Sequence, residues 1–564
     1  MADTGTPPTK GKELSLEIRM FIAFGLMMLV LFATPYIFKG TPKSTPAPAP
    51  KQPAAAQAQS PPEAAKAAPA SPATAPKAAA PVAAGNETTT IIETDLAKVT
   101  FSNRGGVVKS WLLKKYKNSS GAQVDLVSPT AAAKLGAPFS WQFKSQKPAV
   151  DLNQALFAVQ QPDPLTVAFE FSDGKVIARK SFHFVKNSYK LQFASEVIEG
   201  GAPVPHLVAW RGGFGDRTVH NAPATEHTVY FDAAKSKLVT QDMKIAKDGP
   251  VSSSGSYNFA GLEDTYFAAV FLAPPGVPTE IQTWQDTVAA TPDNAEAAQV
   301  GAAVGGEGKN AYALFVGPKD LDSLRAADPK LEQIVDFGWF WWIAKPLFLA
   351  LHWSQANLIP NWGWSIIFVT IIINLLLLPL RFSNLRSMQK MQKLQPEIAK
   401  INERYKNVGL RDPRKAQQNE ETMALYQKHG VSPLGGCLPL ILQMPFFFAF
   451  YKVLTVVIEL RGAPWLWVSD LSQPEAGFFR MLPIIMMLTQ FWMQRMTPPT
   501  PGADPNQQRM MMLMPLILFI PFYSASAGLV LYWLTGNVVG IVQQYFFNKM
   551  AAQPAAGAKS GTKK

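Results

Sequence analysis

The sequence predicts a polytopic α-helical membrane protein with six spans and a separate all-β domain outside the membrane. Long apolar runs crowd the last two fifths of the chain, while period-two alternation of apolar residues fills much of the part before them. Charged residues make up only 16% of the chain, below the roughly 25% of soluble domains. Cys437 is the single cysteine, which excludes an intrachain disulfide and a thiolate metal cluster.

An apolar segment near the N-terminus predicts the first span. Residues 20–38, "MFIAFGLMMLVLFATPYIF", carry no charge, and as a helix they would rise roughly 28 Å, about the thickness of a bilayer core. A cleaved signal peptide is the competing interpretation, but its apolar core would be shorter. We expect residues 1–40 to form an uncleaved signal anchor, and the Pro- and Ala-rich residues 41–87 to form a disordered tether.

Residues 88–320 alternate apolar and polar side chains in the manner of β-strands. "LTVAFEF" is followed by "SDGK" as a turn and by "VIARKSFHFV" as a return strand. "KLQFASEV" alternates in the same way, and "SNRGGVVKSWLL" has the composition of a turn and a strand. Many short strands separated by Gly and Asp turns predict a large antiparallel β-sandwich.

A stretch rich in Trp and Phe, "LEQIVDFGWFWWIAKPLF", predicts an amphipathic helix within residues 321–350. Aromatic side chains of this kind prefer the headgroup layer of a membrane, so we expect the helix to lie on the membrane surface. A helix that packs on the β domain is the alternative.

Residues 351–548 are expected to hold the other five spans. They are placed at about 352–380, 434–458, 481–496, 510–526 and 528–547, and the last two form a tight helical hairpin joined at "SASAG". The span at 481–496 would rise only roughly 24 Å, which is short for a bilayer core and favours local thinning. The polar segment 381–430 has heptad-like apolar spacing broken by Gly409 and Pro413, which predicts a helical hairpin outside the membrane.

The distribution of Lys and Arg predicts the orientation of the spans. Segment 381–430 carries many basic residues, the loop 459–480 carries only Arg461 and Arg480, and the tail 549–564 is basic. The hairpin, the tail and both termini are therefore expected in the cytoplasm, and the β domain outside.

Polar side chains within the spans are the most informative feature for function. They are Thr370, Asn374, Gln443, Gln490, Gln494, Asn537, Gln543 and Gln544, with Tyr532 and Trp533 nearer the outer end of the last span. Such amides can join helices through hydrogen bonds, but carboxamides on four spans favour a hydrated cavity within the bundle. No catalytic motif is evident, and His220 and His227 with Glu226 are more typical of a loop than of a metal site, so we expect neither an enzyme nor a cofactor.

Several blocks in the second half resemble the YidC family of membrane-protein insertases. They are "NWGWSII", "LQPEIAKINERY", "VSPLGGCLPLILQMPFFFAFY", "FWMQRMTPPT", and "GLVLYW" followed by "GNVVGIVQQ". The first span and the outer β domain resemble the Gram-negative form, whose periplasmic domain is a β-supersandwich.

The resemblance implies an inner-membrane protein that inserts and helps fold membrane proteins, alone or beside the Sec translocon. Five core spans would form a hydrophilic groove open to the cytoplasm and to lipid. The implied partners are nascent membrane proteins, Sec components, membrane lipids and, through the cytoplasmic hairpin and tail, the ribosome, with no specific nucleic-acid sequence. Thr370 and Trp533 match groove-facing positions of the family.

One position departs from the family pattern. Members generally carry an arginine in the groove, and alignment on "NWGWSII" puts Asn374 at that position. Arg381, two helical turns further on, is the possible groove charge; Lys452 is the other candidate but should lie nearer the outer leaflet. A secondary transporter is the alternative function, since it also places polar groups at mid-membrane, and an anchored sugar-binding protein is a third.

Overall fold

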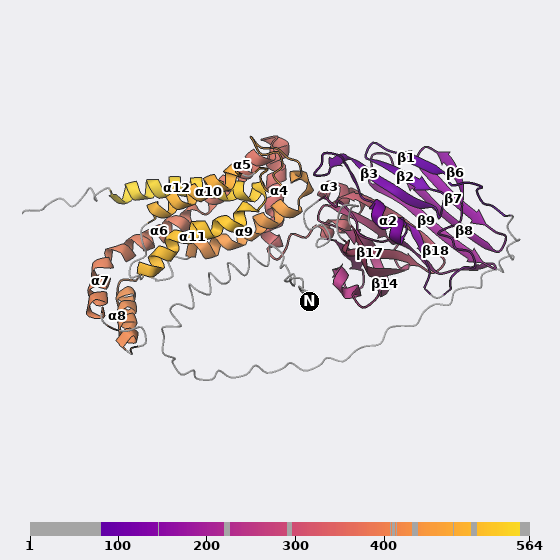
Figure 1. Ribbon diagram of the computed structural model, residues 1–564. Helices are drawn as coiled ribbons and strands as arrows, with labels where there is room; N and C mark the ends of the chain where they lie inside the picture. Colours follow the sequence, from indigo (N-terminus) through magenta and orange to yellow (C-terminus); the bar gives the residue numbers. More distant parts are fainter. Residues whose placement is uncertain are drawn as a thin grey trace, which may run out of the picture. The chain divides into compact units, whose positions relative to one another are not determined.

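The computed structural model describes residues 81–552 except 145, 219–225, 290–295, 407, 409–411, 413, 431–437, 478 and 498–504. The expected signal anchor, most of the expected tether, Cys437, His220 and residues 553–564 of the tail lie outside the described residues. The chain forms two compact units. We call residues 70–348 with 451–463 the β-rich unit, and residues 349–450 with 464–564 the helical unit (Figure 1).

The β-rich unit contains two antiparallel sheets. The small one has the order β1 (Thr89–Glu93), β2 (Ala97–Ser102), β3 (Val107–Lys117) and β4 (Gln123–Asp125). The path of the large, 14-stranded sheet is β5-β11-β17-β16-β14-β15-β18-β9-β8-β7-β6. Its strands are β5 (Ser140–Gln142), β6 (Ala158–Asp163), β7 (Thr166–Ser172), β8 (Val176–Phe184), β9 (Lys190–Glu199), β10 (Ala202–Pro203), β11 (His206–Trp210), β12 (His227–Asp232), β13 (Lys237–Asp242), β14 (Val251–Glu263), β15 (Phe267–Leu272), β16 (Pro278–Ala289), β17 (Glu296–Gly306) and β18 (Lys309–Pro318). Helix α2 (Pro129–Leu135) and the 3-10 helix η2 (Met243–Ala246) complete it.

The strands expected from alternation are confirmed. β7, β8 and β9 pair in sequence order, with a tight turn at Gly174, whose φ of 92° suits glycine. The long strand β14 pairs through its first half with β16 and through its second half with β15. It therefore joins the two parts of the large sheet.

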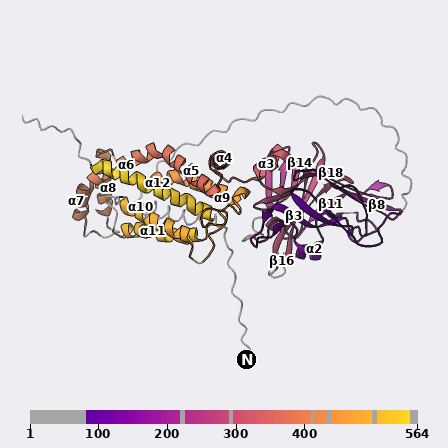
Figure 2. The ribbon, with the colours of Figure 1, turned by 90° about the horizontal axis from the view of Figure 1, so that it is seen from above.

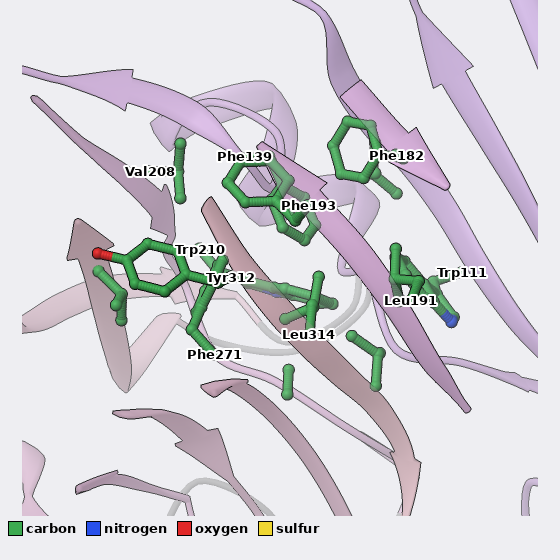
Figure 3. Packing of buried hydrophobic residues seen from close by; sticks show 14 of the residues in the cluster. Trp111, Phe139, Phe182, Leu191, Phe193, Val208, Trp210, Phe271, Tyr312 and Leu314 are labelled. Carbon is green, nitrogen blue, oxygen red and sulfur yellow. The ribbon is translucent and has the colours of Figure 1, made fainter. Parts of the chain in front are cut away.

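Aromatic side chains from several strands surround Phe139 in the core (Figure 3). The Phe139 ring lies 5.1 Å from that of Phe182 and 5.5 Å from that of Phe193, measured between centroids. The backbone of Phe139 has a φ of 67°, which is uncommon for a residue other than glycine. Its carbonyl accepts a hydrogen bond of 2.6 Å from Nζ of Lys180.

Lys180 is a charged residue inside this core, with only 1% of its surface exposed. Besides the Phe139 carbonyl, its Nζ donates to the carbonyls of Gly105 at 3.1 Å and Gly106 at 3.0 Å. An ammonium has three N–H donors, so all of them are satisfied by three carbonyls from two separate loops.

Replacing Lys180 with Met should destabilise the β-rich unit by roughly 3 kcal/mol or more, because three buried carbonyls would each lose a hydrogen bond at about 1 kcal/mol or more apiece. Urea unfolding of the full chain, followed through tryptophan fluorescence, measures the change. Lys175→Met is the control, since Lys175 is exposed at the neighbouring turn. Equal stability of the two variants would contradict the prediction.

The segment expected to form one amphipathic helix at 321–350 is divided instead. It contains α3 (Leu321–Ala327), the 3-10 helix η3 (Pro329–Ile334) and the start of α4 (Trp341–Asn357). Pro329 opens η3, and Gly338 with a φ of 71° separates η3 from α4. α4 continues past residue 351, so the expected span at 352–380 was wrong at its start. Pro360 ends this stretch, and the side chain of Asn361 caps the next helix.

The helical unit consists of α5 (Trp362–Leu376), α6 (Leu378–Lys393), α7 (Gln395–Arg404), α8 (Arg414–Lys428), α9 (Leu438–Val456), α10 (Met481–Met496), α11 (Pro505–Tyr523) and α12 (Ala527–Ala552). α10 has the predicted bounds. α6 crosses the expected boundary at 381 without a break, and α12 continues four residues into the expected tail. α12 packs along α10 and α5 (Figures 1 and 2).

Among the described residues, no single helix combines the length and apolar composition needed to cross a membrane, and only α5 and α6 together do. They are bent by 51° at Leu377, where Pro379 lies in the first turn of α6. The count of six spans therefore stays a prediction.

The expected hairpin is built from the end of α6 with α7 and α8. Met391, Leu394, Ile398 and Tyr426 form its small apolar core. Nη2 of Arg404 lies 2.7 Å from the carboxylate of Glu421, which joins α7 to α8.

Candidate functional site

The helical unit exposes large apolar side chains and buries several polar ones. Leu376 is 74% exposed and Ile520 is 72% exposed, whereas Asn374 and Asn537 are 8% and 4% exposed. A soluble protein would arrange these residue types the other way round. Large exposed apolar faces of this kind suit contact with lipid.

The bend between α5 and α6 directs a cation toward α12. Nη1 of Arg381 donates a 2.7 Å hydrogen bond to Oε1 of Gln543 on α12. Nε2 of the same Gln543 lies 3.5 Å from the backbone carbonyl of Asn374 on α5. The Gln543 side chain therefore lies between the Arg381 guanidinium on α6 and the backbone of Asn374 on α5.

Two glycines on the same face of α12 make room beside this cation. A methyl group added to Gly540 would lie 2.8 Å from Sδ of Met493 and 3.4 Å from Nη1 of Arg381. No atom would lie within 4 Å of a methyl group added to Gly536, one turn earlier, although Gly536 itself is buried. The Arg381 guanidinium therefore packs against Gly540, and open space lies next to Gly536.

Amide side chains also join α10 to α12. Nε1 of Trp533 donates to Oε1 of Gln490 at 3.1 Å. Nδ2 of Asn537 donates to the carbonyl of Met486 at 3.2 Å and lies 3.3 Å from Oγ1 of Thr489. Both contacts are hydrogen bonds between neighbouring helices.

Aromatic rings connect α9 to α11 and α12. The ring of Tyr532 stacks on Phe450 with a centroid distance of 4.1 Å, and its hydroxyl forms a hydrogen bond with the side chain of Gln443. Trp533 contacts Phe447 and Phe522 at 5.3 and 5.0 Å. This layer of rings lies beside the polar groups of α12.

Comparison with known proteins decides the family. The model described as 60Kd inner membrane protein matches residues 353–554, and the YidC periplasmic domain model matches residues 89–350. The membrane protein insertase YidC of Geotalea daltonii is 32% identical over 543 residues, covering 95% of this chain and 99% of that protein. The chain belongs to the YidC family of membrane protein insertases. The membrane protein insertase YidC of Citrifermentans bemidjiense is 34% identical, and the match covers 95% of this chain and 100% of that protein.

A solved structure of this family also resembles the chain. It is the crystal structure of an active YidC insertase with the first transmembrane domain resolved, at 17% identity and a TM-score of 0.36, and the match covers 83% of this chain and 94% of that one. The described strands thus fall within the periplasmic domain of the YidC family, and helices α5 to α12 within its inner-membrane part. As a YidC insertase the protein is non-catalytic.

The predicted YidC site residues fall into two groups. Asn374 and Arg381 lie on either side of the α5–α6 bend, whereas Gln443, Gln490, Tyr532, Trp533 and Asn537 link α9 or α10 to α12. Thr370 donates through Oγ1 to the carbonyl of Ile366, and Asn374 through Nδ2 to that of Thr370. Both are thus bonded to their own helix. Gln494 is half-buried on α10, one turn after Gln490.

Two candidate charges lie in different surroundings. Arg381 belongs to the helical unit. Nζ of Lys452 lies 2.9 Å from the carboxylate of Asp336, and both residues belong to the β-rich unit. Among the described residues, no group of three or more His, Cys, Asp and Glu side chains could hold a metal ion.

Gly536 and Gly540 were absent from the predicted set, and Gln543 was expected as a polar residue of the last span but not as a site residue. They lie at i, i+4 and i+7 on α12, a spacing that puts them on one helix face. That spacing is visible in the sequence, but only the position of Arg381 reveals what the face contacts.

Gly540→Ala should lower insertion activity several-fold and more than Gly536→Ala, because only the methyl group at position 540 would lie within 3.0 Å of another atom, Sδ of Met493, which packs beside Arg381. Both substitutions raise helix propensity by about 1 kcal/mol, so stability alone would not separate them. Insertion of a small two-span protein into proteoliposomes measures the difference. Equal activity of both variants would exclude a seat for Arg381 on Gly540.

Proposed function

We propose that the chain inserts and helps fold membrane proteins in the bacterial inner membrane through a hydrophilic groove beside α12. The observation that carries the proposal is the Arg381 guanidinium, held by Gln543 and seated on Gly540 inside a bundle with an apolar exterior. The open space next to Gly536 supports a path along this face.

The physical role of such a groove is to shorten the dry path across the bilayer. Each unsatisfied backbone group of a substrate costs several kcal/mol in hydrocarbon. Polar side chains on α5, α6, α9, α10 and α12 offer hydrogen bonds while the polar flank of the substrate crosses. The 16-residue helix α10 thins the bilayer beside the groove. Burial of the apolar segment in lipid supplies the driving force, so no nucleotide is required.

Arg381 gives the groove its selectivity. A guanidinium carries five N–H donors and a permanent charge, and Gln543 occupies one of them. In a medium of low dielectric constant, the remaining donors attract carboxylates on the polar flank of a substrate. Arg381 therefore takes the role that the family assigns to the position of Asn374.

The wider assembly follows from the same role. The proposed topology has six spans, both termini and the α7–α8 hairpin in the cytoplasm, and the β-rich unit in the periplasm. The hairpin carries basic side chains such as Arg404 and Arg414, which would face the ribosome, and the Sec translocon is the proposed partner for larger substrates.

Arg381→Gln should reduce insertion of a substrate with an acidic polar flank on the order of tenfold, the equivalent of about 1.4 kcal/mol for a lost charge-assisted hydrogen bond. A substrate with a neutral flank should be much less affected. Arg386→Gln is the matched control, because Arg386 is exposed on the same helix. The assay is insertion into proteoliposomes that contain the pure protein, and uptake of a small solute instead would favour a transporter.

A second substitution tests whether the position of the charge matters. Asn374→Arg in the Arg381→Gln background should restore insertion, since it returns a cation to the groove two turns away. Failure of this double variant to exceed Arg381→Gln, with normal amounts of protein in the membrane, would show that the charge cannot be moved along the helix.

Asn374→Leu should lower insertion less than Arg381→Gln and leave the protein folded, because the Asn374 amide is bonded to its own helix. Site-specific crosslinking from positions 370, 374 and 533 to a stalled nascent chain reports whether the substrate passes these residues. Activity equal to that of the unaltered chain, without crosslinks from any of the three, would count against a groove on this face.

A further inference from the structure

The segment that follows α9 is embedded in the β-rich unit. Residues 451–463 form one compact unit with residues 70–348. Ile458, in the 3-10 helix η5 (Ile458–Leu460), is 1% exposed and belongs to the same hydrophobic core as the strands. Leu460 is fully buried. α9 therefore begins in the helical unit and ends in the β-rich unit.

Arg461 supplies the polar part of this attachment. Its Nη2 donates to the carboxylate of Asp216 and, at 2.9 Å, to the carbonyl of Lys117. Its guanidinium carbon lies 5.3 Å from the centroid of the Tyr266 ring and 5.7 Å from that of Phe267. The side chains of Arg461 and Asp216 are only 9% and 3% exposed, so this ion pair is screened from water.

Hydrogen bonds from Thr218 fix the position of the Asp216 carboxylate, which binds Arg461. Oδ1 of Asp216 accepts from the backbone N–H of Thr218 at 2.9 Å and from its hydroxyl at 2.7 Å. The backbone N–H of Asp216 donates to Asp264 at 3.2 Å. Asp264 in turn accepts from the N–H groups of Tyr266 and Phe267, the two residues whose rings cover Arg461.

A second cation on α9 contacts the same unit. Nζ of Lys452 lies 2.9 Å from Asp336, and its alkyl chain packs on Gly338, where an added methyl group would lie 2.9 Å from Cγ of Lys452. Burial alone would raise the pKa of Asp336, but the Lys452 ammonium beside it lowers the pKa. The two cations lie nine residues apart, one in the last turns of α9 and one just after it.

We propose that Arg461 is a lock that fastens the C-terminal end of α9 permanently to the β-rich unit, with Asp216 as its receptor and Lys452 as a second, weaker attachment. A buried ion pair is strongly destabilising once either partner is lost, because the other charge remains buried without compensation. The attachment is therefore stable only while both Arg461 and Asp216 are present.

The accessibility of Ala463 tests the lock, because Ala463 is 9% exposed and lies two residues beyond Arg461. The full chain carrying Cys437→Ser and Ala463→Cys is reconstituted in liposomes and treated with a membrane-impermeant maleimide. Arg461→Met and Asp216→Asn should each raise the modification rate of Cys at position 463 about tenfold or more. Arg461→Lys, which keeps the charge but not the fork of donors, should give an intermediate rate.

Arg104→Met is the matched control, since it removes one partner of an exposed ion pair in the same unit. Arg104 and Glu87 are 2.9 Å apart and 41% and 39% exposed, so their loss should leave the rate unchanged. Rates for Arg461→Met and Asp216→Asn equal to the control would overturn the proposal. Fast modification accompanied by unfolding of the β-rich unit, measured by tryptophan fluorescence, would also overturn it.

Discussion

Burying a charged group among apolar atoms is costly unless the group finds a partner, and three cations in the described part of the chain show how this constraint is met. Lys180 in the β-rich core donates to three carbonyls. Arg461 is enclosed by a carboxylate, a carbonyl and two aromatic rings. Arg381 differs, because the one hydrogen bond found for it within the described part of the chain goes to Gln543. Lys180 uses all three of its donors, Nη1 of Arg461 has no hydrogen-bond partner among the described residues, and Arg381 is bonded to α12 through Gln543.

The same constraint explains why polar residues in the helices are not all equivalent. Thr370 and Asn374 bond to carbonyls of their own helix, which satisfies their donors without a neighbour. Asn537 and Gln490 bond across to a neighbouring helix and hold α10 on α12. These bonds stabilise single helices or join neighbouring ones, whereas the Arg381 guanidinium bonds from α6 to Gln543 on α12.

Glycine provides the space that this arrangement needs. Arg381 can approach α12 because Gly540 has no side chain, and Gly536 leaves a gap one turn away. In membrane proteins, small residues spaced four apart more often let two helices approach closely. Here one such glycine accommodates a guanidinium, and the other borders open space.

The family, the all-β and helical parts, the strands of the β-rich unit and the amides within the helices could all be predicted from the sequence. These features depend on the spacing of residues within one element and on blocks of adjacent residues, both of which are visible in the sequence. Helix ends were less certain: α4 runs past residue 351 and α6 runs through 381, because Pro360 and Pro379 rather than the hydropathy profile set the breaks.

Which polar groups contact one another depends on the tertiary structure. Arg381 and Gln543 are 162 positions apart, and Arg461 and Asp216 are 245 apart. No periodicity connects such distant residues, because their proximity results from the packing of helices and strands around two separate cores. The bend at Leu377 turns Arg381 toward α12, and the burial of Ile458 among the strands brings Arg461 to Asp216.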